Sequence, residues 1–306
     1  KILAGKPSGA SKGKRSFVVE LDDRKGCPRY TARLLEGVTV KSSPEEAARC
    51  LRLMGSRPVS NAVDATNFAL FETGQPLHAF DFDKIKGGVV IVRRARKGEK
   101  FLALDGNEYI LDEKTLVIAD AERVIALAGV IGGKLTEVDS GTKNILLESA
   151  FFDPTLVRHA SRKYKISTES STRFERGVTP EGVLSASRRC ADLILSWAGG
   201  KEAGFAAKGP LVKTGARRIA LRPARVESLL GVRVDSKKIV KILSALGFGA
   251  KTGGAGRISV TVPPFRRDVA QEADLIEEIV RLEGFDKMPV AIPVTRHTAA
   301  GPRDEK

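Results

Sequence analysis

Three polar side chains in this sequence, His78, Thr66 and Glu148, have the chemistry needed to hydrolyse an ester. A neutral imidazole accepts a proton from water or orients the water, and a threonine hydroxyl can hold a substrate through hydrogen bonds. A carboxylate in an apolar run, as Glu148 is, can accept a hydrogen bond from a buried hydroxyl group. The sequence contains no supported Ser-His-Asp or Cys-His arrangement, so we do not expect a covalent intermediate.

Each of these side chains also has a purely structural interpretation. His78 lies between Gln75-Pro76-Leu77 and Ala79-Phe80-Asp81 and follows no helical or strand period, so the sequence predicts a loop. A histidine held there could equally bond a backbone carbonyl. Glu148 could be a paired carboxylate at the end of a strand, and on the residue types alone this is the commoner case.

A glycine-rich turn at Gly129, Gly132 and Gly133 could complete such a site. Glycine lacks a Cβ atom and adopts positive φ, so its backbone can approach a substrate closely. Backbone amides are suitable donors to the oxygen that becomes negative when an ester is attacked. Glycines in a tight turn are more often structural, so this pattern alone predicts little.

Five ordered stretches of the chain carry a family resemblance. They read VSNAVDATNFALFETGQPLHAFD at Val59–Asp81, LAGVIGG at Leu127–Gly133, ILLESAFFDP at Ile145–Pro154, STESSTRFERGV at Ser167–Val178 and RRDVAQEADLIEEIVR at Arg266–Arg281. In this order they resemble the beta subunit of bacterial phenylalanyl-tRNA synthetase, from Cys27 to about Ile292.

The resemblance implies an editing activity. An apolar pocket for phenylalanine rejects tyrosine poorly, because tyrosine merely adds a hydroxyl group, and a second site that hydrolyses mischarged tyrosyl-tRNA solves this problem. The family assigns recognition of the phenol to Glu148 and action in the editing site to His78 and Thr66. It places five more positions in the pocket: Ala128, Gly129, Gly132, Thr168 and Ser170.

Ser170 departs from the family pattern, which has alanine at this position. Its added hydroxyl is expected to narrow the pocket or to offer one more hydrogen bond.

In the assembled enzyme the resemblance implies an alpha subunit and phenylalanine tRNA as partners, in an α2β2 heterotetramer. ATP would be a substrate of the whole enzyme only, since this chain contains no ATP-binding motif.

An acidic helix near the C-terminus matches positions that the family treats as a Mg²⁺ site shared with the alpha subunit: Asp268, Asp274, Glu277 and Glu278. The last three share a helical face, and carboxylate oxygens suit Mg²⁺. The alternative is an exposed acidic face supported by Arg281, with Asp268 and Gln271 forming a capping box. Asp268 and Asp274 would then lie about 120° apart around the helix, which is awkward for one ion.

The net charge of +15 favours a polyanionic partner such as RNA, but the excess is spread along the chain and equally fits a generally basic surface. The three cysteines, Cys27, Cys50 and Cys190, have no metal-ligand spacing, so we expect neither zinc nor a disulfide. No apolar run approaches the roughly 20 residues that cross a bilayer. We expect a cytoplasmic protein that is a piece of a longer chain and does not bind membranes.

The pattern of strands and helices predicts an α+β fold with two domains. Residues 1–26 read as a linker and a first strand, 27–200 as a strand-rich mixed editing domain, and 201–216 as a second linker. Residues 217–292 read as a small α+β domain with two helices and a hairpin, which suggests docking or nucleic-acid binding, and 293–306 as a tail. Its second helix, at Ser236–Leu246, offers lysines but no arginine or asparagine for bidentate base contacts, so docking or nonspecific RNA contact is preferred over DNA reading.

Individual elements follow from local signals. Ser43 and Glu46 predict a capping box before a helix that Gly55 ends. Apolar alternation and turn residues predict several strands, at Ser16–Leu21, Tyr30–Val40, Val89–Arg94, Glu108–Leu111, Thr115–Ala119 and Val124–Ala128. Amphipathic spacing predicts helices at Glu181–Trp197, Pro223–Leu230 and Val269–Leu282. The remaining functional alternative is a noncatalytic RNA- or protein-binding module with a degenerate pocket.

Overall fold

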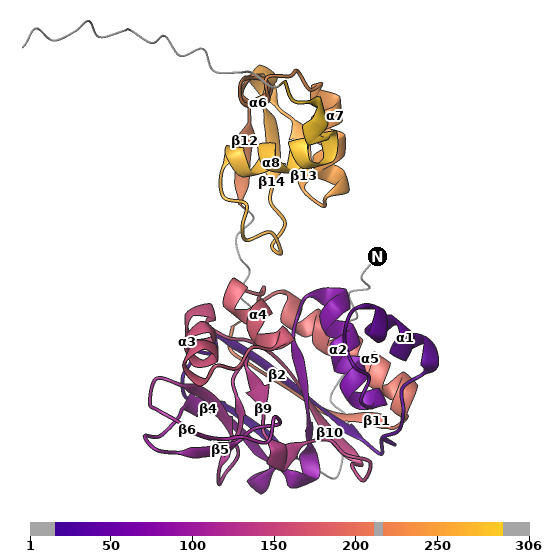
Figure 1. Ribbon diagram of the computed structural model, residues 1–306, viewed down its shortest axis with the longest axis vertical. Coiled ribbons are helices and arrows are strands. Elements are labelled where there is room, and N and C mark those ends of the chain that lie inside the picture. Colours follow the sequence, from indigo (N-terminus) through magenta and orange to yellow (C-terminus); the bar gives the residue numbers. More distant parts are fainter. Residues whose placement is uncertain (1–15, 211–216, 290–306) are drawn as a thin grey trace, which may run out of the picture. The chain divides into compact units, whose positions relative to one another are not determined.

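The computed structural model describes residues 16–210 and 217–289 and divides into two compact units, Lys1–Thr214 and Gly215–Lys306 (Figure 1). Both units mix helices with largely antiparallel sheets, which confirms the predicted α+β class. Within the described residues, no helix has the length and apolar character needed to cross a membrane.

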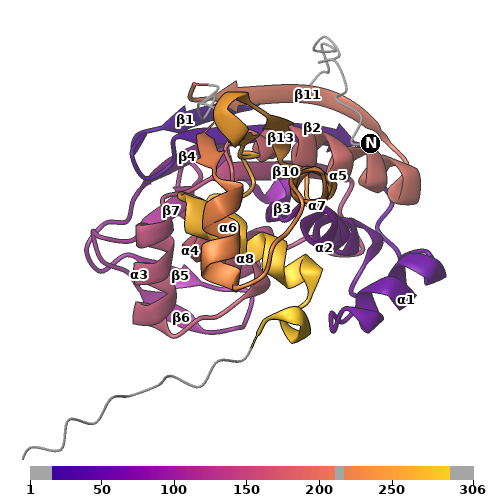
Figure 2. The ribbon, with the colours of Figure 1, turned by 90° about the horizontal axis from the view of Figure 1, so that it is seen from above.

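A four-stranded antiparallel sheet forms the centre of the first unit. Its strand order is β11 (Lys201–Lys208), β2 (Arg29–Glu36), β10 (Asn144–Phe151), β3 (Leu77–Asp81). Strands β2 and β10 are buried along nearly their whole length, although β2 alternates the polar Arg29, Thr31 and Arg33 with apolar residues. Helices α2 (Asn61–Thr73) and α5 (Gly182–Ala198) pack together against one face of this sheet (Figure 2).

The other face of this sheet contributes to the largest core, which it shares with a five-stranded sheet. That sheet has the order β1 (Val18–Leu21), β4 (Val89–Arg94), β7 (Leu116–Ala119), β8 (Val124–Leu127), β9 (Ile131–Gly132). β1 and β4 are parallel, and the other pairs are antiparallel. A hairpin of β5 (Lys100–Leu102) and β6 (Glu108–Ile110) is separate.

Two short helices, α3 (Pro154–Tyr164) and α4 (Glu169–Arg176), follow β10 and pack on each other. Both begin at conventional caps. Asp153 accepts hydrogen bonds from the amides of Thr155 and Leu156, and Thr168 forms a capping box with Ser171. The sequence patterns did not predict these helices, although both caps are visible in them.

Most predicted strands of the first unit are confirmed, but the segment before β3 was misread. The stretch Val59–Asp81 is not a loop: it forms α2, capped by Ser60 and ended by Gly74 at φ 73°, and then β3, which contains His78. The predicted capping box at Ser43 is also wrong. Helix α1 (Glu45–Leu53) begins after Pro44, and the Ser43 hydroxyl instead donates to the Asp64 carboxylate.

The predicted linker at 201–216 is too long. Residues 201–208 form β11, which pairs with β2 over its whole length, so they belong to the central sheet. The sequence KEAGFAAK suggested a linker because it is charged and contains glycine. Residues 211–216, residues 1–15 of the predicted linker and first strand at 1–26, and the predicted tail 293–306 lie outside the described residues.

The second unit agrees closely with the prediction. Strands β12 (Arg218–Leu221), β14 (Ile258–Thr261) and β13 (Gly249–Thr252) form a three-stranded antiparallel sheet in that order. Helices α6 (Pro223–Leu230), α7 (Ser236–Ala245) and α8 (Glu272–Glu283) complete it. A separate apolar core, which includes Leu221, Ile239, Leu243 and Ile279, holds these elements together.

Candidate active site of the first unit

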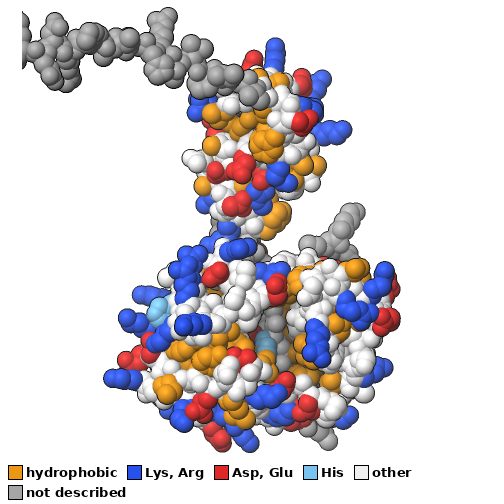
Figure 3. Space-filling model, viewed as in Figure 1, with side chains coloured by type: hydrophobic (Ala, Val, Ile, Leu, Met, Phe, Trp, Pro, Cys, Tyr) orange, Lys and Arg blue, Asp and Glu red, His pale blue; other side chains and the backbone are white. Residues whose placement is uncertain are grey.

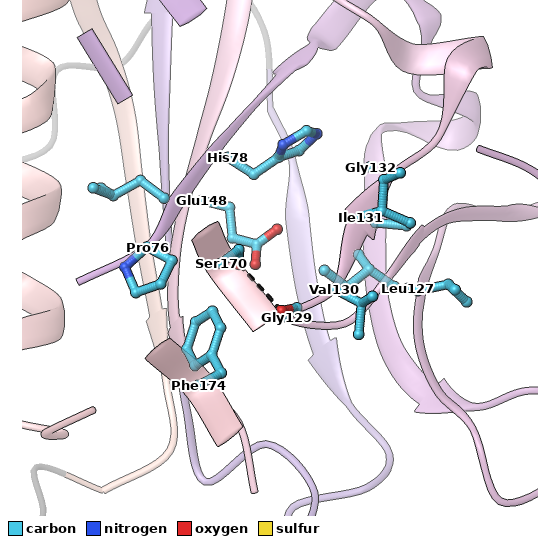
Figure 4. A pocket seen from close by; sticks show the side chains of 13 residues that line it. Pro76, His78, Leu127, Gly129, Val130, Ile131, Gly132, Glu148, Ser170 and Phe174 are labelled. Atoms are coloured by element: carbon cyan, nitrogen blue, oxygen red, sulfur yellow. Dashed lines mark hydrogen bonds between the residues drawn. The ribbon is translucent and has the colours of Figure 1, made fainter. Parts of the chain in front are cut away.

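A pocket of about 70 Å³ lies between the two sheets of the first unit, large enough for several water molecules or a small group. Strands β3 and β10 supply His78 and Glu148 from one side, and the turn between β8 and β9 faces them (Figure 4). The lining is otherwise mostly apolar: Pro76, Leu77, Ile118, Ala126, Leu127, Gly129, Val130, Ile131, Gly132, Ser170 and Phe174.

Glu148 lies in the middle of β10, directly opposite His78 of β3 and Ala32 of β2. Its side chain is buried, and its Oε2 atom has no hydrogen-bond partner among the described residues. Burial raises the pKa of Glu148 to about 8, and the neighbouring Tyr30 hydroxyl opposes this rise in part. Glu148 thus lies in mid-strand and forms no ion pair among the described residues, which differs from a charge-paired carboxylate at a strand end.

His78 is half-buried and presents its imidazole to the pocket. Its ring packs edge-on against Phe80, with centroids 4.5 Å apart. Burial lowers the pKa of His78 to about 4, so the imidazole is neutral near pH 7. Gly132 faces the ring so closely that a Cβ atom there would lie 2.5 Å from Nε2 and still nearer to Cε1. The absence of a side chain at Gly132 thus leaves room for the imidazole.

The turn that faces Glu148 is shaped by Gly129 and held by α4. Gly129 has φ 71°, and its carbonyl accepts a hydrogen bond of 3.1 Å from Ser170 Oγ (Figure 4). Thr168 Oγ1 donates to the next carbonyl, that of Val130, at 2.8 Å. The amides of Val130 and Gly133 donate to Leu127 and Ile125. The turn therefore contributes a fixed shape, since these two amides are not free to bind a substrate.

Comparison with known proteins identifies the family. Residues 26–199 match the family described as "B3/4 domain", which covers more than half of the chain and includes every residue of the pocket. The chain belongs to the B3/4 domain family. Residues 219–285, within the second unit, match the "tRNA synthetase B5 domain".

The relatives of this chain include three bacterial proteins named phenylalanine--tRNA ligase beta subunit. Those of Moorella thermoacetica, Syntrophus aciditrophicus and Salinibacter ruber are 46%, 42% and 42% identical, over 87%, 91% and 98% of this chain. They confirm the resemblance seen in the sequence. The chain spans about a third of their length, namely 33%, 35% and 36%.

A solved structure is also similar, an N-terminal fragment of the phenylalanyl-tRNA synthetase beta-subunit from Pyrococcus horikoshii. It is 18% identical, with a TM-score of 0.43, and the match covers 90% of this chain and 77% of that chain.

Three of the predicted pocket residues do not line the pocket of the B3/4 domain. Thr66 is buried in α2, and its hydroxyl donates to the Val63 carbonyl of its own helix at 2.6 Å. The Ala128 amide donates to Leu116 in the adjoining strand, and Thr168 caps α4 and holds the turn. Thr168 thus holds the turn without lining the pocket, and the role of Thr66 stays a prediction.

Two residues that the sequence reasoning missed contribute to the site. Phe174 lines the pocket, and its spacing of four residues from Ser170 places both on the same face of α4. Tyr30 lies behind Glu148 on β2, fully buried, and its hydroxyl has no partner within the described residues. The helical spacing could have revealed Phe174. Tyr30 could not be found from sequence, because its proximity to Glu148 depends on strand pairing.

For the ester hydrolysis expected from the sequence, replacing Ser170 by alanine is predicted to slow the reaction about two- to tenfold, because one neutral hydrogen bond contributes about 1 kcal/mol. The Ser170 hydroxyl is used to hold the Gly129 carbonyl, so its loss loosens the turn and does not remove a reacting group. The measurement is the deacylation rate of tyrosyl-tRNA by the two proteins. An unchanged rate would show that this hydroxyl has no role.

Three of the four acidic residues predicted to bind Mg²⁺ in the B5 domain are bound to protein groups. Asp268 and Glu278 each bind Arg266, at 2.6 and 2.7 Å, and Glu278 also binds Arg281 at 2.6 Å. Asp274 caps α8 by accepting the amides of Ala270 and Gln271, at 2.7 and 2.9 Å. The predicted capping box is therefore wrong in its residues: the N-cap is Gln271 and its partner is Asp274.

These four positions do not fit a magnesium ion by themselves. Glu278 is buried and forms ion pairs with two arginines, Arg266 and Arg281. The sequence predicted that Arg281 would instead pair with Glu277, whose side chain is exposed. Within residues 16–210 and 217–289, no group of three or more His, Cys, Asp or Glu side chains is arranged to hold a metal. A site shared with a second subunit stays a prediction for the assembled enzyme.

Proposed function

We propose that the pocket of the B3/4 domain hydrolyses tyrosine from mischarged phenylalanine tRNA. The observation that carries this proposal is Glu148 Oε2, a buried oxygen without a partner in a mostly apolar pocket. An unsatisfied buried group costs about 1–3 kcal/mol, and the phenolic hydroxyl of a tyrosyl group would satisfy it. A phenylalanyl group would leave the oxygen unpaired, so the pocket favours the incorrect product.

The protonation state of Glu148 suits this role. With a pKa of about 8 the carboxyl is mostly neutral at pH 7, which lowers the free-energy cost of placing it in an apolar pocket. A neutral carboxylic acid still has a carbonyl oxygen that accepts a hydrogen bond. It can therefore recognise the phenol without bringing a full charge into the site.

Hydrolysis in this pocket needs one water molecule. The water oxygen bonds to the ester carbonyl carbon, the bond between this carbon and the ribose oxygen breaks, and the ribose oxygen leaves with a proton. The products are tyrosine and tRNA. Neutral His78 orients the water by accepting its hydrogen bond. The Gly129 turn, fixed by Ser170 and Thr168, sets the shape of the opposing wall.

The wider assembly follows from the relatives. We propose that the chain is part of a phenylalanyl-tRNA synthetase beta subunit, acts in the cytoplasm, and binds an alpha subunit and phenylalanine tRNA in an α2β2 heterotetramer. Activation of phenylalanine with ATP belongs to the assembled enzyme. The B5 domain would help in this assembly.

Replacing His78 by alanine is expected to lower the deacylation rate about 100-fold, the lower range for a residue that positions or deprotonates the attacking water. Because the pKa of His78 is about 4, the wild-type rate should change by less than about twofold between pH 7 and 5.5. The measurement is the rate of tyrosine release from tyrosyl-tRNA across this pH range.

His159→Ala is the matched control, since His159 is exposed on α3 and does not line the pocket. Equal rates for all three proteins would exclude His78 from the reaction. No deacylation by this chain or by the full heterotetramer would indicate a noncatalytic RNA- or protein-binding module.

A further inference from the structure

The outer face of α3 carries an unpaired basic surface. The helix and its C-cap contain four Lys or Arg residues and no Asp or Glu. Three of these basic residues, Arg158, Arg162 and Lys165, are exposed and make no ion pair within the described residues. Their spacing of i, i+4 and i+7 places them on one side of the helix. We call these three residues the α3 basic face.

The opposite side of α3 packs directly on the wall of the pocket. A Cβ atom at Gly129 would lie 2.9 Å from Val157 of α3 and 3.0 Å from Phe174 of α4. Only the thickness of one helix, about 10 Å, therefore separates the α3 basic face from the Gly129 turn. Figure 3 shows Lys and Arg side chains gathered over α3 and α4, beside a hollow on the same face of the unit.

Lys165 has a costly backbone conformation. It caps α3 with φ 56° and is the one residue other than glycine with positive φ in the described ranges. L-residues other than glycine rarely adopt this conformation, and glycine is the usual choice at this position after a helix. Replacing Lys165 by glycine would therefore remove a positive charge from the α3 basic face and also remove the unfavourable backbone conformation.

We infer that the α3 basic face binds the phosphate backbone of the RNA whose 3′ end enters the pocket. Guanidinium and ammonium groups without protein partners are free to bind phosphates, and a row of them beside a pocket matches the charge of a nucleic acid strand. The inference rests on the proposed function for the identity of the RNA. The α3 basic face would then be one specific place where the net charge of +15 contacts RNA.

The test compares the triple variant Arg158→Gln, Arg162→Gln, Lys165→Gly with a control that removes the same charge elsewhere. Lys41, Arg49 and Arg57, in or beside α1, are also exposed and without ion pairs in the described residues, so their triple change to Gln is the control. Binding of phenylalanine tRNA to the 306-residue chain is measured from 50 to 200 mM salt. Hydrolysis of a tyrosyl ester of adenosine, which lacks phosphates, is measured in parallel.

Each phosphate contact contributes about 0.7–0.9 to the slope of log affinity against log salt. We expect the α3 variant to bind tRNA more weakly with a slope smaller by about two to three, the control to keep the wild-type slope, and both to hydrolyse the adenosine ester at the wild-type rate. An unchanged slope in the α3 variant, or equal losses in variant and control, would overturn the inference. A wild-type chain that binds tRNA but does not hydrolyse the small ester would count against the proposed function, while the binding comparison would still decide the role of this face.

Discussion

Replacing Glu148 by glutamine is expected to lower the deacylation of tyrosyl-tRNA about 5- to 150-fold, which corresponds to the 1–3 kcal/mol of leaving a buried polar group without its partner. Glutamine has the same shape, but its NH₂ group carries two N–H donors in place of the single O–H of the neutral acid, and it competes with the carbonyl for the position of the buried Oε2 atom. The phenolic hydroxyl then loses its acceptor. Rates are measured over a range of tyrosyl-tRNA concentrations above and below KM, so that changes in kcat and KM are separated.

A matched control for this variant is the slow hydrolysis of phenylalanyl-tRNA by the same proteins. Phenylalanine has no hydroxyl to lose, so its rate should change much less than the tyrosine rate in Glu148→Gln. If both rates fall together, Glu148 supports the fold or the water and does not recognise the phenol.

The stability of the B3/4 domain is expected to fall with rising pH because of Glu148. Its pKa is 4.5 when unfolded and about 8 when folded, so between these values the folded protein binds a proton that the unfolded chain lacks. Unfolding then releases a proton, and the free energy of unfolding decreases by up to about 1.4 kcal/mol per pH unit, from about pH 4.5 to about pH 8. Glu148→Gln cannot titrate and should lose this dependence.

Because the chain has a single tryptophan, unfolding measured by tryptophan fluorescence reports on one unit only. Trp197 is at the end of α5, edge-on to Phe68 of α2, so its fluorescence in urea reports unfolding of the first unit. His78 acts in the opposite direction, because its pKa is lowered from 6.5 to about 4. The quantity to compare is therefore the difference in the free energy of unfolding between wild type and Glu148→Gln at each pH. A difference that stays constant from pH 5 to 8 would contradict a proton on buried Glu148.

The fold could be predicted from the sequence where local signals and burial agree. The second unit was predicted almost element by element, because its helices end in glycine at Gly231, Gly247 and Gly284 and have one apolar face each. Helix α2 was missed because it is buried on several sides and holds buried Asn61 and Asp64, so it lacks an amphipathic stripe. Its signals, Ser60 before it and Gly74 after it, were present.

The site could be predicted only in part. The family resemblance pointed to Glu148, His78, Gly129, Gly132 and Ser170, and all five line one pocket. No local pattern could bring them together, because the pairing of β3 with β10 places His78 opposite Glu148 across about 70 residues of sequence.

Thr66 is the catalytic candidate that does not line this pocket, so its part in the reaction stays a prediction. It is in the correct segment, but its hydroxyl is bound within its own helix.

The most direct test of the proposed function is the ratio of tyrosyl-tRNA to phenylalanyl-tRNA hydrolysis by this 306-residue chain at pH 7. A buried acceptor that only tyrosine can satisfy predicts a ratio of at least about 10 for wild type, and a ratio near 1 for Glu148→Gln with its fold intact. A wild-type ratio near 1 with measurable hydrolysis of both substrates would contradict recognition of the phenol by Glu148.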